Sequence, residues 1–142
     1  MPETSPEIAE ELELTELASQ NFRRWNESLQ THNSEEVALL YAAEASFLPT
    51  LDEKLRQGPA KTAQYFEHFL EKNPAGEIIE QAIQPLGPDI YLHSGLYNFE
   101  VDSADHTKRE IVEARFTFVW QKNGQGEWKI IHHHSSLRPN ND

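Results

Sequence analysis

The stretch Trp128-Lys-Ile-Ile-His-His-His-Ser-Ser-Leu-Arg-Pro139, close to the end of the chain, joins an apolar run to three histidines and two serines. Successive side chains of a strand point to opposite faces of its sheet. A regular strand here would therefore carry two rows of side chains. One row would be Trp128, Ile130, His132, His134 and Ser136, and the other Lys129, Ile131, His133 and Ser135. The chemistry that such a strand offers is a His-x-His pair with a hydroxyl two residues further on.

Working outward from this strand, the second half of the chain consists of extended segments separated by short turns. The four predicted strands are residues 77–85, 90–101, 108–121 and 127–137. Short connections make neighbouring strands antiparallel. The first half instead has apolar residues at three- and four-residue spacing, which indicates helices. The predicted helices are residues 5–31, with Ser5 as N-cap, 34–41 and 60–71, and a short strand is predicted at 45–48.

Helices followed by a run of strands indicate the α+β class. We expect a curved antiparallel sheet that forms a cone, with the three helices of the first half packed on its concave face. The length of 142 residues suits a single domain over residues 1–142, whose ends at 1–6 and 138–142 we expect to be frayed.

Charge and composition argue against several classes of function. Lys and Arg number 12 against 24 Asp and Glu, and the net charge of −12 disfavours binding to nucleic acid or to an anionic membrane. The absence of cysteine removes disulfides, thiolate nucleophiles and thiolate metal ligands. No apolar run approaches the roughly 20 residues of a transmembrane helix, and the acidic N-terminus lacks the pattern of a signal peptide. We therefore expect a cytoplasmic protein.

The strand predicted at 108–121 distinguishes the two faces of the sheet. Its apolar row is Ala114, Phe116, Phe118 and Trp120, and its mixed row is Glu113, Arg115, Thr117 and Val119. We expect the mixed row to line a polar pocket. The apolar row exceeds what three helices can cover, so we expect a homodimer formed through the sheet.

Seven short motifs follow one another along the chain. They are Trp25-Asn26, Leu40-Tyr41-Ala42, Leu48-Pro49-Thr50, Tyr65-Phe66-x-x-Phe69-Leu70, Gly95-x-Tyr97-x-Phe99, Ala114-Arg115-Phe116-Thr117-Phe118 and His132-His133-His134-Ser135-Ser136. The order of elements resembles the cone fold of nuclear transport factor 2-like proteins. The pattern from Trp128 to Pro139 resembles the association domain of calcium/calmodulin-dependent protein kinase II. Taken together, the seven motifs resemble the iota class of carbonic anhydrase.

The last resemblance implies reversible hydration of carbon dioxide to bicarbonate in a cavity between the helices and the sheet. In that class, hydroxyl groups on the Leu-Pro-Thr, Tyr-Phe and His-Ser-Ser motifs hold bicarbonate. Carried over, these hydroxyls belong to Thr50, Tyr65 and Ser136 or Ser135. We expect Thr50, Tyr65, His134 and Ser136 to be catalytic. We expect Arg115, His132 and Ser135 to bind the substrate.

Other interpretations of the same residues remain open. His132 and His134 could begin a zinc site, although neither His93 nor His106 is an evident third ligand. We predict a site without a metal or other cofactor. The strand histidines could instead be core or interface residues, Tyr65 a packing residue, and Thr50 a loop cap.

Two other functions also fit the pattern. One is a non-catalytic ligand-binding or assembly module. The other is a small-molecule isomerase or cyclase, because one fold can host several chemistries. An isomerase would need an acid–base pair in its pocket, for which Asp52 is the nearest carboxylate to the Leu-Pro-Thr motif.

Overall fold

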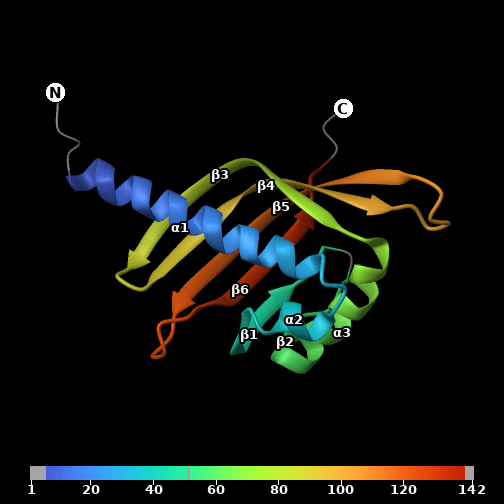
Figure 1. Ribbon diagram of the computed structural model, residues 1–142, viewed down its shortest axis with the longest axis horizontal. Helices are drawn as coiled ribbons and strands as arrows, with labels where there is room; N and C mark the ends of the chain where they lie inside the picture. The colour runs from blue at the N-terminus through green and yellow to red at the C-terminus, as the bar shows by residue number, and fades with distance from the viewer. Residues whose placement is uncertain (1–5, 51, 140–142) are drawn as a thin grey trace.

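The computed structural model describes residues 6–50 and 52–139, which form an α+β cone (Figure 1). Ser5, the predicted first N-cap, lies outside the described residues. The three predicted helices are confirmed as α1 (Pro6–Leu29), α2 (Ser34–Ala38) and α3 (Pro59–Phe69), and a 3-10 turn, η1 (Leu70–Lys72), follows α3. The side chain of Asn33 caps α2 by accepting a hydrogen bond from the backbone N–H of Glu35.

The sheet has six strands in the order β2-β1-β6-β5-β4-β3. The strands are β1 (Tyr41–Leu48), β2 (Arg56–Gln57), β3 (Ala75–Gly87), β4 (Ile90–Asp102), β5 (Arg109–Lys122) and β6 (Trp128–Leu137). Strands β3 to β6 form the predicted antiparallel series. Strand β1, in contrast, pairs in parallel with the other edge of β6. Residues far apart in sequence make this pairing, so local patterns did not reveal it.

Helix α1 crosses the concave face of the sheet (Figure 1), and its Phe22 ring packs against Phe116 and Phe118 of the apolar row of β5. Phe118 and Trp120 are fully buried, and Phe116 is nearly so. The rings of Trp25 and Phe118 have centroids 5.3 Å apart in an edge-to-face arrangement, which is favourable for aromatic pairs. The protein's own helix therefore covers this row. The expectation that this row stays exposed and forms the interface with a second copy of the chain is wrong.

Strand β6 contains a β-bulge close to its middle. Trp120 of β5 pairs with Ile130, and the preceding residue of β5, Val119, pairs with His132. Ile131 thus has no partner of its own on β5. An extra residue in one strand of a pair interrupts the regular alternation of its side chains.

The bulge reverses the assignment of faces that regular alternation predicts for the end of the strand. Ile130, His133 and Ser135 are buried on the concave face. The residues on the outer face are His132, His134 and Ser136. The prediction that these three share a face with Ile130 is wrong, because it assumed a strand without a bulge.

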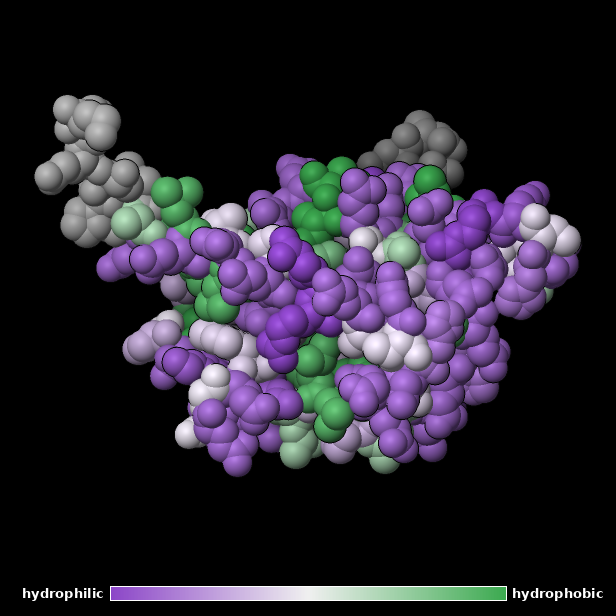
Figure 2. Space-filling model, in the orientation of Figure 1, coloured by the Kyte–Doolittle hydropathy of each residue, from purple (hydrophilic) through white to green (hydrophobic). Residues whose placement is uncertain are grey.

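The surface that carries α1 is predominantly hydrophilic, with small separate apolar areas (Figure 2). Within residues 6–50 and 52–139, no helix is long and apolar enough to cross a membrane.

Candidate active site

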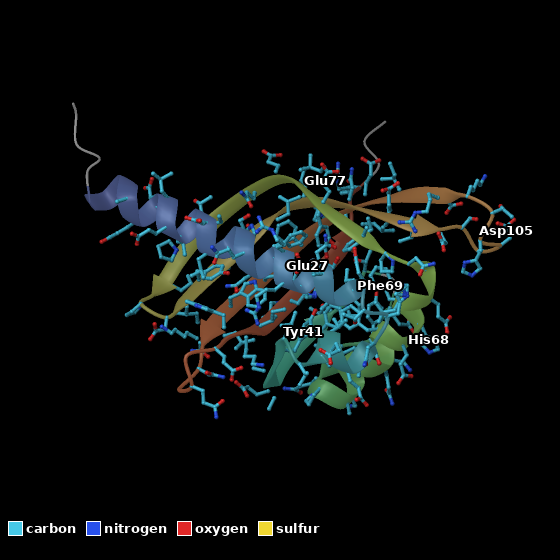
Figure 3. The ribbon with its side chains drawn as sticks, in the orientation of Figure 1. Glu27, Tyr41, His68, Phe69, Glu77 and Asp105 are labelled. Atoms are coloured by element: carbon cyan, nitrogen blue, oxygen red, sulfur yellow. The ribbon has the colours of Figure 1, made fainter. Side chains whose placement is uncertain are left out.

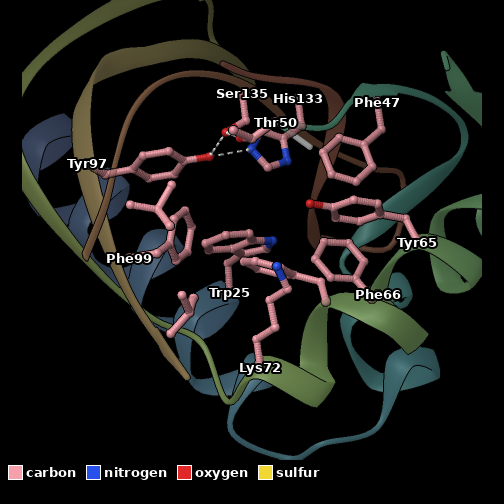
Figure 4. A pocket seen from close by; sticks show the side chains of 13 residues that line it. Trp25, Phe47, Thr50, Tyr65, Phe66, Lys72, Tyr97, Phe99, His133 and Ser135 are labelled. Carbon is pink, nitrogen blue, oxygen red and sulfur yellow. Dashed lines mark hydrogen bonds between the residues drawn. The ribbon is translucent and has the colours of Figure 1, made fainter. Parts of the chain in front are cut away.

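A small cavity lies between the concave face of the sheet, α3 and the end of α1 (Figure 4). Its volume is about 30 Å³. Aromatic side chains form most of its wall. The lining residues are Trp25, Phe47, Thr50, Tyr65, Phe66, Phe69, Lys72, Tyr97, Phe99, Val101, Val112, His133 and Ser135.

Hydroxyl and imidazole groups reach this cavity from four separate parts of the chain. Thr50 follows β1, Tyr65 comes from α3, Tyr97 from β4, and His133 with Ser135 from β6. In Figure 4 the Tyr65 hydroxyl points across the cavity toward the side on which Thr50 and Ser135 lie. Helix α3 has one buried side, and Figure 3 shows Phe69 turned toward the interior while His68, the preceding residue, lies toward the outside.

Several buried polar groups beside the cavity form one continuous hydrogen-bonded chain. The Trp25 indole N–H donates to the Tyr41 hydroxyl over 3.0 Å. The Tyr41 oxygen lies 2.8 Å from His133 Nδ1, and His133 Nε2 lies 3.3 Å from the Tyr97 hydroxyl. We call this series of groups the polar chain; Figure 4 shows its last part.

The polar chain ends at two hydroxyls on the cavity wall. Tyr97 donates to Ser135 Oγ over 2.5 Å, and Ser135 is hydrogen-bonded to Thr50. These two bonds join β4, β6 and the segment after β1. The cavity is thus held in shape by side chains as well as by the sheet.

Burial sets the protonation of the groups in this site. It lowers the pKa of His133 well below its ordinary value, because no charge of opposite sign accompanies the ring. Rings of Phe47 and Phe118 stack on the two sides of the imidazole, with centroids 4.7 and 4.0 Å away. Burial also raises the pKa of the Tyr65 and Tyr97 hydroxyls. At neutral pH these phenols are hydrogen-bond donors, and His133 is uncharged.

A wider recess of about 300 Å³ lies next to the cavity and shares Tyr65, Phe69 and Lys72 with it. Asp52 lines this recess, where its carboxylate accepts a hydrogen bond of 2.8 Å from Arg56 Nε. That hydrogen bond lowers the pKa of Asp52. Asp52 is therefore an ionised partner of Arg56 in the recess, and it does not line the small cavity. Among the described residues, no carboxylate lines the cavity.

The structure places three of the predicted site residues together and four elsewhere. Thr50, Tyr65 and Ser135 line the cavity. The four that do not are His132, His134, Ser136 and Arg115, which lie on the outer face of the sheet. The mixed row of β5 faces outward with them, away from the cavity described above. His132 is bonded to Ser46, with a distance of 2.8 Å from Nδ1 to Oγ.

The residues of the cavity do not fit a catalytic metal. Its donors are one imidazole and neutral hydroxyls, whereas zinc sites use several imidazole, thiolate or carboxylate ligands. His132 and His134 are on the other face of the sheet, and no group of three or more His, Asp or Glu side chains within residues 6–50 and 52–139 could hold a metal ion.

Sequence reasoning missed four members of the polar chain, namely Trp25, Tyr41, Tyr97 and His133. Tyr41 was predicted at the end of a helix, and it is the first residue of β1. Tyr97 lies in one of the seven motifs, but its neighbours in the sequence do not indicate that its hydroxyl faces a cavity. The bulge that turns His133 inward has no clear signal in a run of three identical residues.

Comparison with known proteins gives one family match. The model of the calcium/calmodulin dependent protein kinase II association domain matches residues 13–139. A solved structure from Xanthomonas campestris, assigned to that association domain, is 38% identical to this chain. The match covers 88% of this chain and 87% of the other, with a TM-score of 0.83.

More distant solved structures share the fold alone. A nuclear transport factor 2-like superfamily protein from Salmonella enterica is 17% identical, with a TM-score of 0.75 and coverage of 91% and 94% of the two chains. A ketosteroid isomerase-like protein from Erwinia carotovora is 12% identical, with a TM-score of 0.70 and coverage of 86% and 94%. Among curated proteins, none matches this chain.

Proposed function

The chain belongs to the calcium/calmodulin dependent protein kinase II association domain family, and within that family we propose that it catalyses the reversible hydration of carbon dioxide to bicarbonate. One observation carries the proposal: a cavity of about 30 Å³ whose wall is mostly aromatic and aliphatic, with a few hydroxyl groups, one imidazole and Lys72 as its polar members. Thr50, Tyr65 and Ser135 supply three of these hydroxyl groups. They come from the Leu-Pro-Thr, Tyr-Phe and His-Ser-Ser motifs that resemble the iota class.

The size of the cavity limits the substrate. One water molecule needs roughly 10–15 Å³ on this measure, and sites for drug-sized ligands run to about 300–1,000 Å³. A volume of about 30 Å³ therefore suits a molecule of three or four heavy atoms. Carbon dioxide and bicarbonate are of that size. A steroid or another ring substrate of an isomerase is far larger, and the wall also lacks the carboxylate that such a reaction needs.

The wall suits the two states of this substrate. Carbon dioxide is apolar and fits among Phe47, Phe66 and Trp25. When the oxygen of a water molecule bonds to the carbon, one carbon–oxygen π pair moves onto an oxygen, and that oxygen becomes negative. Hydrogen bonds from Tyr65 and from the Ser135–Thr50 pair can stabilise this charge, and donors fixed in a dry site are effective because they need little reorganisation.

The attacking water must also lose a proton for the reaction to balance. No carboxylate is available on the described cavity wall, so we place the acceptor in the water-accessible recess at the mouth. His68 and Lys72 line that recess. In this scheme a second water in the recess relays the proton, and the His68 imidazole, which lines the recess, accepts it.

Stopped-flow measurement of carbon dioxide hydration tests the proposal. The purified protein is measured before and after exhaustive chelation, with its metal content verified. Activity that survives chelation supports the site of hydroxyls described above. Activity that disappears and returns with one added metal would transfer the chemistry to a metal. An inactive protein in both states would contradict the proposal.

A second candidate function is assembly, which the family match favours. The outer face of the sheet carries half-buried apolar side chains in its central strands, among them Leu92, Leu96 and Val119. None of these lies on the α1 side of the sheet. We propose that a homodimer forms through this outer face. The apolar row of β5, on which the dimer was first predicted, has no part in it.

A further inference from the structure

The polar chain begins at a group that can only donate. The Trp25 indole has one N–H and no lone pair available for a hydrogen bond, so the Tyr41 oxygen must be the acceptor in their bond. The single hydroxyl proton of Tyr41 then remains for its other partner. That partner is His133 Nδ1, 2.8 Å away. A nitrogen that accepts this proton carries none of its own.

We infer that Trp25 and Tyr41 fix His133 as the neutral tautomer with its proton on Nε2, and that they thereby orient the whole polar chain so that its last free proton points into the cavity. Nε2–H then donates to Tyr97, and Tyr97 donates to Ser135. Each group thus donates its hydrogen bond in the direction of Thr50.

The Ser135–Thr50 pair is the part of the polar chain that can bind a ligand in the cavity. The pair has two hydroxyl protons, and only one is used in the bond between the two residues. The proton of Tyr97 already occupies one lone pair of Ser135. Whichever of the two residues donates to the other, one hydroxyl proton is left for the cavity. Tyr65, which makes no hydrogen bond with the described residues, adds a second.

The inference specifies the class of ligand and rests on the proposed function for its identity. A cavity that presents hydroxyl protons recognises small molecules that expose acceptor oxygens, such as carbon dioxide, bicarbonate or another small oxyanion. It also gives His133 a defined part: it is a positioning residue, because both of its nitrogens are engaged within the polar chain. It is not the base that removes a proton from the attacking water.

Alternative states of His133 conflict with its surroundings. An imidazolium would turn an N–H toward the Tyr41 oxygen, and the hydroxyl proton of Tyr41 would then lose its acceptor. The ring would also hold its charge between Phe47 and Phe118, without a carboxylate nearby. The opposite neutral tautomer would leave the hydroxyl proton of Tyr41 without its acceptor.

Nitrogen-15 NMR of the histidine side chains in the full-length protein tests this directly. His133 is assigned by the signals that His133→Gln removes. At neutral pH we expect a pyrrole-like shift for Nε2 and a pyridine-like shift for Nδ1, unchanged by moderate acidification. A protonated Nδ1, or a pair of shifts typical of imidazolium, would overturn the inference.

Substitutions at the start of the polar chain separate its orientation from simple packing. Trp25→Phe removes the obligatory donor, so we expect Tyr41 to become able to accept from His133 and both tautomers to be populated. Tyr41→Phe removes one hydroxyl with little change of volume, and we expect a large shift of Nδ1. Tyr91→Phe is the matched control, because Tyr91 is equally buried but bonds to Asn21. Identical His133 shifts in Tyr41→Phe and the control would refute the role of Tyr41.

Nitrate and urea, which have the same number of heavy atoms, test the ligand class without any turnover. We expect nitrate, which only accepts hydrogen bonds, to move the His133 signals in a saturable way, and urea at equal concentration to move them much less, because its four N–H groups would face hydroxyl donors. A response to urea but not to nitrate would refute the donor-lined cavity. An inactive protein that still shows the expected tautomer would contradict the proposed function and leave the orientation intact, so the two failures are distinguishable.

Discussion

At the scale of single residues, the two adjacent serines of β6 provide a matched comparison. Ser135 is buried on the cavity wall, whereas Ser136 lies on the outer face. We predict that Ser135→Ala lowers carbon dioxide hydration by about tenfold or more, because a hydroxyl of the polar chain is lost, and that Ser136→Ala changes it by less than about twofold. Stopped-flow rates of both variants decide the matter. Equal losses of activity in the two variants would contradict the assignment of Ser135 to the cavity and of Ser136 to the outer face.

Tyr65 is the donor that stands alone on the opposite side of the cavity. Tyr65→Phe removes only its hydroxyl, so we predict a loss of about 10²-fold in hydration rate, as for other donors to a developing oxyanion. The unfolding free energy should change by less than about 1 kcal/mol, because the described residues form no bond to this hydroxyl. Thermal unfolding and stopped flow on the same preparation measure both. Full activity would make Tyr65 a packing residue.

His93 couples folding to pH away from the cavity. It is completely buried, and its Nε2 lies 2.8 Å from Gln81 Oε1, while Nδ1 has no partner within residues 6–50 and 52–139. Burial lowers its pKa from 6.5 to about 4. Between these values the unfolded chain binds a proton that the folded chain does not, so the stability that neutral burial provides is complete above pH 6.5 and is lost as pH falls toward 4.

We therefore predict that the thermal midpoint of the wild-type protein decreases between pH 7 and pH 5 more than that of His93→Gln. The expected contribution is up to about 1.4 kcal/mol per pH unit within this window. Differential scanning calorimetry at several pH values checks it. The variant retains His133, whose pKa burial also lowers, so the difference between the two proteins isolates His93. Parallel curves would contradict the prediction.

At the scale of elements, Gly95 shows how closely β3 and β4 approach each other. A Cβ at this position would lie 2.0 Å from the backbone oxygen of Glu80. We predict that Gly95→Ala destabilises the protein by about 2 kcal/mol or more, because backbone must move to make room. Gly124→Ala in the turn before β6 is the control, since nothing lies within 4 Å of its Cβ position. Chemical denaturation compares the two, and equal stability would refute the close approach.

The elements also show where sequence reasoning works and where it stops. Periodicity located all three helices and the antiparallel series, because local patterns of burial decide such segments. The motifs pointed to Thr50, Tyr65 and Ser135, because each of these residues lies in a short run of sequence that can be recognised without knowledge of the fold. The sequence could not show which residues of β6 lie on each face of the sheet, because the bulge at Ile131 arises from pairing with β5 and β1. The same holds for Tyr41, whose partners lie 16 and 92 residues away.

At the scale of the whole molecule, the outer face of the sheet is the surface that the helices leave open. Val119 lies there at the centre of the sheet, paired with Leu92 and His132. If this face forms the proposed homodimer, Val119→Lys should convert the dimer to a monomer, because it places like charges at the centre of the interface. Leu39→Lys, at a position 61% exposed and outside the sheet, serves as the control. Sedimentation velocity at micromolar concentration measures both, and a monomeric wild-type protein would rule out the dimer.

The bulge in β6 occurs in a segment where neighbouring residues are chemical duplicates. If the strand moved by one position, His134 and Ser136 would occupy the places that His133 and Ser135 now hold. An imidazole would still stack between the phenylalanines, and a hydroxyl would still meet Thr50. Loss of one residue from the preceding turn would disrupt the site of a strand with a single histidine and a single serine, but here it would leave an imidazole and a hydroxyl on the cavity wall. The duplicated histidine and serine therefore allow this strand to shift by one residue in one direction and still supply the groups of its site.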